Sequence, residues 1–247
     1  MEILNERGIP FLVGGAYALR EYTGVVRDTK DFDIFLCEEE LRPALRLFRA
    51  AGYRADIAFP HWLAKVHHGK AFIDLVFRAG NGLCEVDARW FRTIRTAQLL
   101  GVEVRLVPPE FMIWQKAYIM ERERFDGADV THLIRSCASG MDWEQLVALF
   151  GPDWRVLLSH LILFGFIYPE ENALVPPSLL RELLQRLTSE NEPVQSPPHL
   201  CRGTLLSRQQ YLDDVERWGY HDARLSPRSR MSEAEIRHWT DAIDTPA

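Results

Sequence analysis

The chain of 247 residues lacks the features that mark several protein classes. Its four cysteines (Cys37, Cys84, Cys137 and Cys201) show no CxxC or other metal-ligand spacing. We therefore expect reduced, mostly buried thiols rather than a disulfide framework. No signal peptide is visible, because the start is acidic and its apolar part is short. The longest apolar run, residues 156–168, contains Ser and His and is too short to span a bilayer. These absences predict a cytoplasmic protein that contacts no membrane.

An excess of basic residues is also lacking. The formal net charge is −6, which argues against broad electrostatic binding to nucleic acid or anionic membrane. A local basic groove is compatible with this balance, so nucleic acid stays a partner that the net charge does not favour. No internal repeat or low-complexity tract occurs. The length allows one large domain or two small ones, each with a real core.

Strand and helix patterns alternate over roughly the first 110 residues. We expect strands at 9–13, 31–36, 53–59, 62–68, 71–77 and 102–107, and helices at 14–24, 38–53 and 89–100. The strands between 53 and 77 are joined too tightly for parallel crossover connections, which predicts a mixed sheet.

After Pro108-Pro109 the pattern becomes helical. We expect helical segments at 110–138, 142–151, 153–169, 176–190, 207–220 and 231–243, with a Pro-rich linker at 191–204. The sequence thus predicts an α+β protein with a small mixed-sheet core followed by a helical C-terminal domain. The expected boundaries are 1–108 for the core, 109–190 for the helical domain and 191–247 for the linker and C-terminal helical tail.

Two carboxylates interrupt the apolar strand DFDIFL at residues 31–36. Because side chains alternate along a strand, Asp31 and Asp33 point the same way, and the apolar residues point into the core. Adjacent carboxylates repel, and a divalent cation removes that conflict. Oxygen-only ligands suit Mg²⁺. A third acid, Asp74, lies in the strand AFIDLVF; if this strand neighbours the first, three carboxylates converge, enough to hold two metal ions for phosphoryl displacement.

Gly14 and Gly15 follow the first strand and precede the first helix of the core. Glycines at such a junction let the backbone approach a phosphate, and a helix N-terminus favours negative charge. Arg27 and Lys30, close to the Asp pair, can offset triphosphate charge. The pattern therefore favours a binding site for a nucleoside triphosphate such as ATP.

The order VGG (13–15), DFD (31–33) and IDLV (73–76) resembles the DNA polymerase β-like nucleotidyltransferase superfamily. The stretch RDTKDFDIF is similar to the Arg-x-Thr-x-Asp-h-Asp-h-h form (h apolar) of a bacterial branch that includes abortive-infection toxin nucleotidyltransferases and uncharacterised relatives. The resemblance covers about residues 9–135. It implies that Asp31, Asp33 and Asp74 bind Mg²⁺, two ions in all, with Asp74 helping to activate the attacking hydroxyl. The glycines and Lys30 would hold the triphosphate.

Residues 107–130 also resemble that branch, in which a Lys on the first helix after the core, then an Arg and an Asp, help to bind the nucleotide. The matching positions are Lys116, Arg122 or Arg124, and Asp126 or Asp129. Two plainer interpretations are equally compatible with the sequence. Lys116 among large apolar residues can extend along a helix surface to water, and the two acids can cap a helix break near Gly127.

Two other patterns favour structural roles. His67-His68 point to opposite sides of a strand and precede a hairpin turn at Gly69, so a metal-ligand pair is disfavoured. Arg89, Arg92 and Arg95 recur every third residue, which favours a solvated helix face over a polyanion contact.

The resemblance implies a nucleotidyltransferase that moves NMP from an NTP to an acceptor hydroxyl. The acceptor stays open among a small molecule, a tRNA end and a protein side chain. The main alternative is a catalytically inactive relative that binds nucleotide or a partner protein as a regulatory module. A hydrolytic phosphodiesterase is less attractive, since metal-spaced histidines are missing from the sequence.

Overall fold

The computed structural model describes residues 1–93, 95–189 and 198–242. The chain divides into two compact units, one formed by Met1–Pro108 with Arg224–Ala247 and the other by Pro109–Ala223. The division after residue 108 coincides with the change from alternating to helical patterns. The segment expected as a tail is shared between the two units, and residues 190–197 of the expected linker lie outside the described residues.

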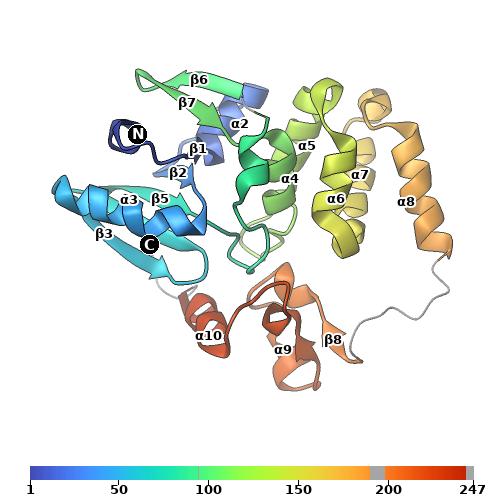
Figure 1. Cartoon of the computed structure of the whole chain (residues 1–247). Coiled ribbons are helices and arrows are strands. Elements are labelled where there is room, and N and C mark those ends of the chain that lie inside the picture. The colour runs from blue at the N-terminus through green and yellow to red at the C-terminus, as the bar shows by residue number, and fades with distance from the viewer. Residues whose placement is uncertain (94, 190–197, 243–247) are drawn as a thin grey trace. The chain divides into compact units, whose positions relative to one another are not determined.

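A seven-stranded mixed sheet forms the first unit (Figure 1). Its strands, in the spatial order β3-β4-β5-β2-β1-β7-β6, are β1 Leu12–Val13, β2 Asp31–Phe35, β3 Arg54–Phe59, β4 Leu63–His68, β5 Ala71–Val76, β6 Arg95–Leu99 and β7 Val102–Leu106. The pairs β2–β5 and β1–β7 are parallel, and the other neighbours are antiparallel. The predicted α+β class and the mixed sheet are confirmed.

The helices α2 Gly15–Thr23 and α3 Glu38–Ala50 pack against strands of this sheet. Helix α1 Glu2–Glu6 packs against α3, and the late helix α10 Glu233–Asp241 contacts β3. The helix α3 opens on three glutamates, which suit the positive end of the helix dipole. It packs against β3 and β4 and buries Leu41, Leu45 and Phe48, so the hydrophobic stripe of this helix holds the sheet from one side.

The helix expected at 89–100 is wrong. The structure has a short 3₁₀ turn at Ala88–Phe91 and then strand β6, which pairs with β7 in an antiparallel hairpin. Leu100 and Gly101 at the hairpin tip both have positive φ, as a two-residue hairpin loop requires. Pairing with β7 outweighed the local helical spacing, so Arg89, Arg92 and Arg95 do not form a helical stripe.

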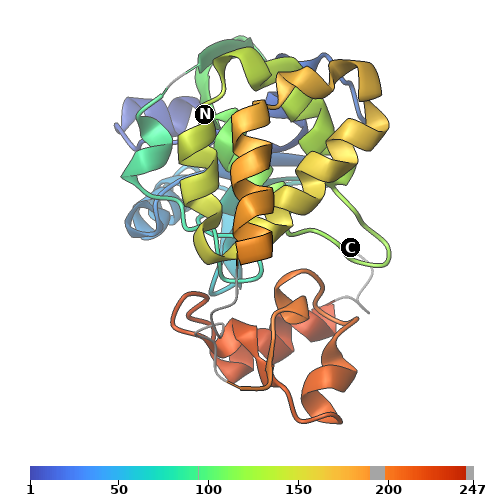
Figure 2. The ribbon, with the colours of Figure 1, turned by 90° about the vertical axis from the view of Figure 1, so that its right-hand side faces the viewer.

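The second unit is helical. Its helices are α4 Pro109–Lys116, α5 Gly127–Cys137, α6 Trp143–Phe150, α7 Trp154–Ile167, α8 Pro177–Ser189 and α9 Leu212–Glu216. Figure 2 shows α6, α7 and α8 beside one another, and α7 packs against both of the others. A small parallel pair, β8 Leu200–Cys201 and β9 His221–Asp222, follows. The long helical segment expected at 110–138 is broken between Lys116 and Gly127.

Two aspartates that precede helices, Asp142 before α6 and Asp153 before α7, behave differently. Asp142 accepts a hydrogen bond from the backbone N–H of Gln145 at 2.9 Å and caps α6. Asp153 makes no such bond to α7 and instead accepts one from the Tyr118 hydroxyl at 2.9 Å. A buried tyrosine hydroxyl needs a hydrogen-bond partner. Asp153 supplies that partner to Tyr118 instead of capping α7, which follows directly on a 3₁₀ turn.

The helical run Trp143–Ile167 is long and apolar enough to cross a membrane by length and composition. Half of its most apolar window is buried inside the protein, and a core helix passes the same test, so the run is weak evidence for a membrane span. Most of the apolar run at residues 156–168 lies in α7, which is buried on one face. Leu157, Leu161 and Phe164 are buried, whereas Ile162 and Phe166 are 56% and 82% exposed.

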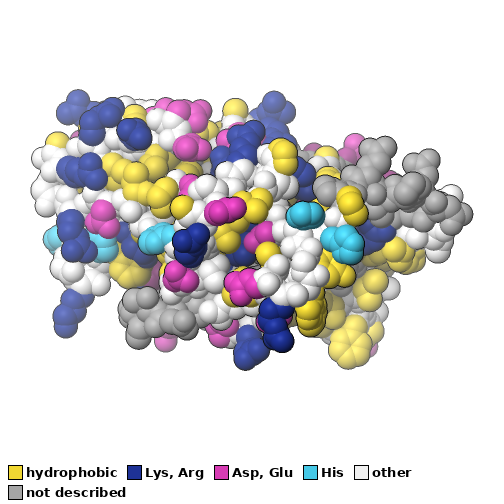
Figure 3. All heavy atoms as spheres, turned by 90° about the horizontal axis from the view of Figure 1, so that it is seen from below, with side chains coloured by type: hydrophobic (Ala, Val, Ile, Leu, Met, Phe, Trp, Pro, Cys, Tyr) yellow, Lys and Arg dark blue, Asp and Glu magenta, His cyan; other side chains and the backbone are white. Residues whose placement is uncertain are grey.

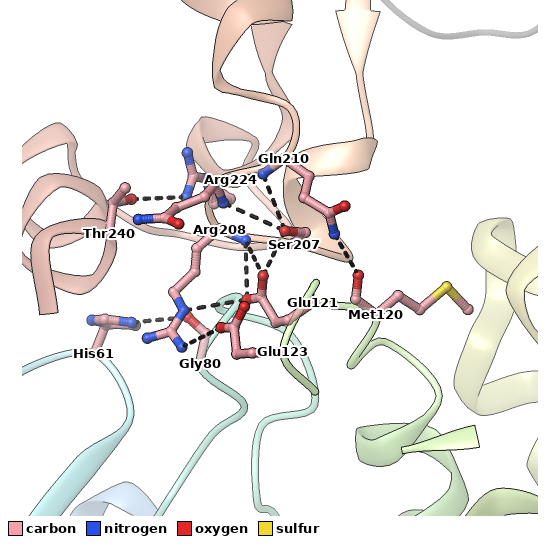
Figure 4. Close-up of polar contacts among 11 residues, drawn as sticks. His61, Gly80, Met120, Glu121, Glu123, Ser207, Arg208, Gln210, Arg224 and Thr240 are labelled. Carbon is pink, nitrogen blue, oxygen red and sulfur yellow. Dashed lines mark hydrogen bonds and ion pairs between the residues drawn. The ribbon is translucent and has the colours of Figure 1, made fainter. Parts of the chain in front are cut away.

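Residues 199–210 are tied to the loop after α4 within the second unit (Figure 4). The carboxylate of Glu121 accepts hydrogen bonds from the Ser207 hydroxyl at 2.5 Å and from the Arg208 backbone N–H at 3.1 Å. Gln210 donates from Nε2 to the Met120 carbonyl at 3.1 Å. Arg208 also forms an ion pair with Glu121 at 3.2 Å. These contacts give the sequence-distant segment a defined place in the helical unit.

The C-terminal segment of the first unit packs against the loop at residues 80–82 and against strand β3. The Ser229 hydroxyl donates to the Asn81 carbonyl at 2.7 Å, and the His238 ring lies 3.1 Å from the Ala58 carbonyl. The ring of Trp239 lies against Gly80 so closely that a Cβ there would be 2.8 Å from it. Figure 4 shows Arg224, which is fully buried and donates to Thr240. Residues far apart in sequence are therefore packed as one unit.

Replacing Gly82 should test this packing. Gly82 has a φ of +80°, and an added Cβ would strike the backbone and hydroxyl of Ser229. We expect Gly82→Ala to lower the free energy of unfolding by about 2–4 kcal/mol, since strain and overpacking add. Gly52→Ala is the matched control, because Gly52 has a φ of +88° and no neighbour within 4 Å; it should lose about 1–2 kcal/mol. Equal losses in urea unfolding would show that Ser229 does not pack there.

Candidate active site

The three acids predicted from the sequence lie on one face of the sheet. Strands β2 and β5 are parallel neighbours, and Asp33 is directly opposite Asp74 in the register. The expectation that these two strands are adjacent is confirmed. Asp31, two residues before Asp33, projects from the same face, and its register partner is Phe72. The carboxylates come from two strands separated by about forty residues of sequence, and only strand pairing joins them.

The opposite face explains why this register is fixed. Ile34 and Leu75 are partners in the same ladder and both are completely buried. Phe32, on that face too, packs its ring 4.9 Å from the ring of Tyr17 on α2. A shift by one residue would place these apolar groups where the acids are. Burial of the apolar face therefore holds Asp33 and Asp74 side by side.

A fourth side chain on the acidic face was not predicted. Lys65 on β4 is the register partner of Asp74, and its ammonium donates to Asp74 Oδ1 at 2.9 Å. Burial raises the pKa of Asp74, the hydrogen bond and charge of Lys65 lower it, and the charge of Asp31 raises it again; the net direction is upward. Asp31 is thus close enough to Asp74 to act on its charge. A Lys in a strand with no motif around it gives no sequence signal for this role.

The acids fit a hard cation by donor chemistry. Carboxylate oxygens are the ligands that Mg²⁺ takes from proteins, and a cation would relieve the charge of Asp31 that raises the pKa of Asp74. As the side chains stand, no group of three His, Cys, Asp or Glu within the described parts of the chain is arranged to hold a metal ion. Lys65 occupies Oδ1 of Asp74 in this arrangement.

Gly14 and Gly15 start helix α2 directly against strand β2. The Gly14 backbone N–H donates to the Asp33 carbonyl at 3.0 Å. Gly15 has a φ of +55°, and a Cβ at this position would strike the Asp33 carboxylate; a Cβ at Gly14 would strike the ring of Phe35. The first N–H groups of a helix lack partners within the helix. The two glycines thus bring a helix N-terminus beside Asp33, where an anion is favoured.

A hollow of about 230 Å³ lies along α2 and the following loop. It is lined by Ala16, Tyr17, Arg20, Val26, Arg27, Asp28 and Thr29. Two arginines therefore line one hollow along α2. Arg27 was predicted as a phosphate ligand, whereas Arg20 was not, because it reads as an ordinary polar position of an amphipathic helix. Lys30, also predicted, is exposed and immediately precedes β2.

Lys116 lies in the second unit, where its ammonium is 2.9 Å from Asp126 Oδ2 and 2.7 Å from Asp129 Oδ2. Arg124 forms a two-pronged pair with Asp126, at 2.8 Å and 2.9 Å. Of the two arginines left open by the sequence, Arg124 joins this cluster, and Arg122 lines a different hollow. The contacts give Lys116 a structural role in closing the break between α4 and α5, and its binding of nucleotide stays a prediction.

Residues 1–144 match the family described as nucleotidyl transferase of unknown function (DUF2204). The chain belongs to this family. The match spans the sheet and extends to α6, so the resemblance to nucleotidyltransferases that was seen in the sequence is confirmed.

Several solved structures of nucleotidyltransferases are similar to parts of the chain. The antibiotic-resistance factor ANT(2'')-Ia shares 19% identity with a TM-score of 0.43, over 64% of this chain and 91% of that one. The lincosamide antibiotic adenylyltransferase LnuA, bound to lincomycin, shares 11% identity with a TM-score of 0.38, over 53% and 90%. A tRNA nucleotidyltransferase complexed with a primer tRNA and an ATP analog shares 14% identity with a TM-score of 0.30, over 76% and 67%. These scores are too low to carry an argument about substrate. No curated protein matches the chain.

The Lys116 cluster predicts an acid-sensitive contribution to stability. Burial alone would raise the pKa of Asp126, but hydrogen bonds and charges from Arg124 and Lys116 lower it from 3.8 to about 2. The ionised carboxylate therefore stabilises the fold above the unfolded value of 3.8, and this stabilisation is lost as the pH falls through about 2. We expect a contribution of about 2 kcal/mol.

Urea unfolding of the protein and of Asp126→Asn across this pH range would measure the contribution. The variant should be less stable at neutral pH and should lose less stability on acidification. Asp213→Asn is a suitable control. Asp213 is exposed, and its ion pair with Arg217 at 3.3 Å is of the surface kind that contributes little to stability. A parallel pH dependence in the protein and Asp126→Asn would contradict the role given to this carboxylate.

Proposed function

We propose that this protein transfers a nucleoside monophosphate from a nucleoside triphosphate to an acceptor hydroxyl in a reaction that requires Mg²⁺. The observation that carries this proposal is the register of β2 with β5, which sets Asp33 opposite Asp74 and places Asp31 on the same face. The N-terminus of α2 approaches Asp33 through Gly15. Three carboxylates beside a helix N-terminus are suited to a cation and the phosphates that it neutralises.

In this proposal Asp31 and Asp33 hold the cation pair, with Asp74 as the third ligand. Mg²⁺, when bound, neutralises charge that develops on the phosphates. The hydroxyl oxygen of the acceptor forms a bond to the α-phosphorus, and the bond from that phosphorus to the bridging oxygen of the β-phosphate breaks, releasing pyrophosphate. The hydroxyl proton passes to Asp74, whose raised pKa makes it a better base than an exposed carboxylate.

The triphosphate would lie against the start of α2. Gly15 is the first residue of α2, and the hollow along that helix is lined by Arg20 and Arg27, among others. Lys30 would add a further positive charge at the start of β2. Planar guanidinium groups bind phosphate oxygens in pairs, which supports a polyphosphate rather than a single carboxylate as ligand.

Charge supports an acceptor other than nucleic acid. Most of the excess negative charge of the chain lies in the second unit, whereas the first is close to neutral. Figure 3 shows both acidic and basic side chains on one face, with several Lys and Arg at its left end. A long polyanion gains little from two units of which one is nearly neutral and the other acidic in net charge. We therefore place a hydroxyl of a small molecule or a protein ahead of a tRNA end.

The test is a labelling survey. The purified protein, Mg²⁺ and each of the four α-labelled NTPs are added to a lysate, which is then separated into small molecules, RNA and protein. We expect label in one fraction with the unaltered protein. Asp33→Ala should remove it completely while the protein stays folded, because Asp33 contributes its carboxylate to the site and not its bulk to the core. Circular dichroism would check the fold.

Asp56→Ala is the matched control for that survey. Asp56 lies on the same sheet face, on strand β3, and is exposed. Its removal should leave transfer unchanged. Label that persists with Asp33→Ala would show that the site assignment is wrong. Tight binding of Mg²⁺ and NTP without any label would favour the regulatory, non-catalytic alternative, and labelled NMP released to water would favour hydrolysis.

Gly15→Ala should lower the rate of transfer through its contact with Asp33 and not only through a loss of stability. The new Cβ would displace the Asp33 carboxylate, so we expect transfer to fall about 100-fold, as misplacement by about an ångström does in other enzymes. Gly24→Ala, at the other end of α2, has a similar positive φ of +74° but no neighbour within 4 Å. It should cost stability alone. Equal effects of both variants on transfer would indicate that backbone strain, and not contact with Asp33, is responsible.

A further inference from the structure

Lys65 is held in the acidic face by two neighbours. Its ammonium donates to Asp74 Oδ1 at 2.9 Å and lies 4.0 Å from the centre of the Phe72 ring. The side chains of Lys65 and Asp74 are only 26% and 11% exposed. A lysine side chain has large rotamer freedom in water, and this freedom is lost when both an anion and an aromatic face bind its end. Lys65 is thus fixed in place.

The lysine also changes what Asp74 can bind. It takes Oδ1, which leaves Oδ2 as the oxygen that a cation or an acceptor hydroxyl can use. It brings one positive charge among Asp31, Asp33 and Asp74, so the four side chains carry a formal charge of about −2 when all the acids are ionised. Without this ammonium the face would attract a divalent cation more strongly.

We propose that Lys65 is a positioning residue for Asp74. It fixes the carboxylate through Oδ1 so that Oδ2 faces the reacting groups, and it limits the affinity of the face for divalent cations. The proposal rests on the proposed function, because it takes the three acids as the cation-binding and proton-accepting groups. Nothing in the sequence motifs points to Lys65; only the β4–β5 register places it beside Asp74.

The first measurement is the binding of Mn²⁺ alone, without nucleotide, by titration calorimetry. We expect Lys65→Met to bind Mn²⁺ about tenfold more tightly than the unaltered protein, because a neighbouring positive charge is removed and Oδ1 of Asp74 becomes accessible. Lys65→Arg, which keeps the charge, should bind Mn²⁺ with nearly the original affinity. A residue that merely supports the fold would weaken binding when it is removed, so the sign of the change is informative.

The second measurement is transfer to the acceptor that the survey finds. Lys65→Met should lower kcat about 10- to 100-fold, as loss of a group that orients a ligand carboxylate does elsewhere, with little change in the KM for NTP. Asp74→Asn alone and the double variant Lys65→Met with Asp74→Asn should have equal rates, because Lys65 acts through Asp74. An additional loss in the double variant would show that Lys65 acts by another route.

Lys70→Met is the matched control, since Lys70 is an exposed lysine at the turn between β4 and β5. It removes the same charge from the same hairpin and should alter neither measurement. Unchanged or weaker Mn²⁺ binding by Lys65→Met would overturn the positioning role while leaving the proposed function intact. If the unaltered protein bound no Mn²⁺, the metal assignment of the proposed function would be wrong, and this inference with it.

Discussion

The parallel pairing of β2 with β5 is the interaction on which the candidate site depends. It sets Asp33 opposite Asp74, although the polypeptide between them contains a helix and two other strands. Parallel neighbours need a crossover connection, and here α3 and the β3–β4 hairpin supply it. The apolar partners Ile34 and Leu75, both fully buried, fix the register. The free energy that places the acids therefore comes from the face of the sheet that does no chemistry.

The contact between α2 and β2 is the second constraint. It is so close that neither Gly14 nor Gly15 has space for a side chain. In return, the helix N-terminus and the Asp33 carboxylate share one region. A phosphate and a cation can then be bound together, since each stabilises the other. The same closeness makes the site sensitive to changes of a single methyl group, in contrast to the open positions at other glycines such as Gly24.

The charged clusters around Asp126 and around Asp74 show how differently carboxylates can be used. Asp126 is buried beside Lys116 and Arg124, which lower its pKa to about 2. It stays ionised at any physiological pH and acts as a fixed structural anion. Asp74 has one ammonium partner, and burial together with Asp31 raises its pKa. A carboxylate of this kind can exchange partners and accept a proton, which a doubly paired one cannot do easily.

Local sequence determined most strands and helices, the glycine junction and the two carboxylates on one face of β2, because period and turn chemistry act over a few residues. It failed at residues 89–100, where pairing of β6 with β7 outweighed a helical spacing. It also gave no sign of Lys65, which only the β4–β5 register brings to Asp74. Tertiary structure decided these points, since a residue on a strand acquires its neighbours only when the strands pair, and strand order is not encoded in any single segment.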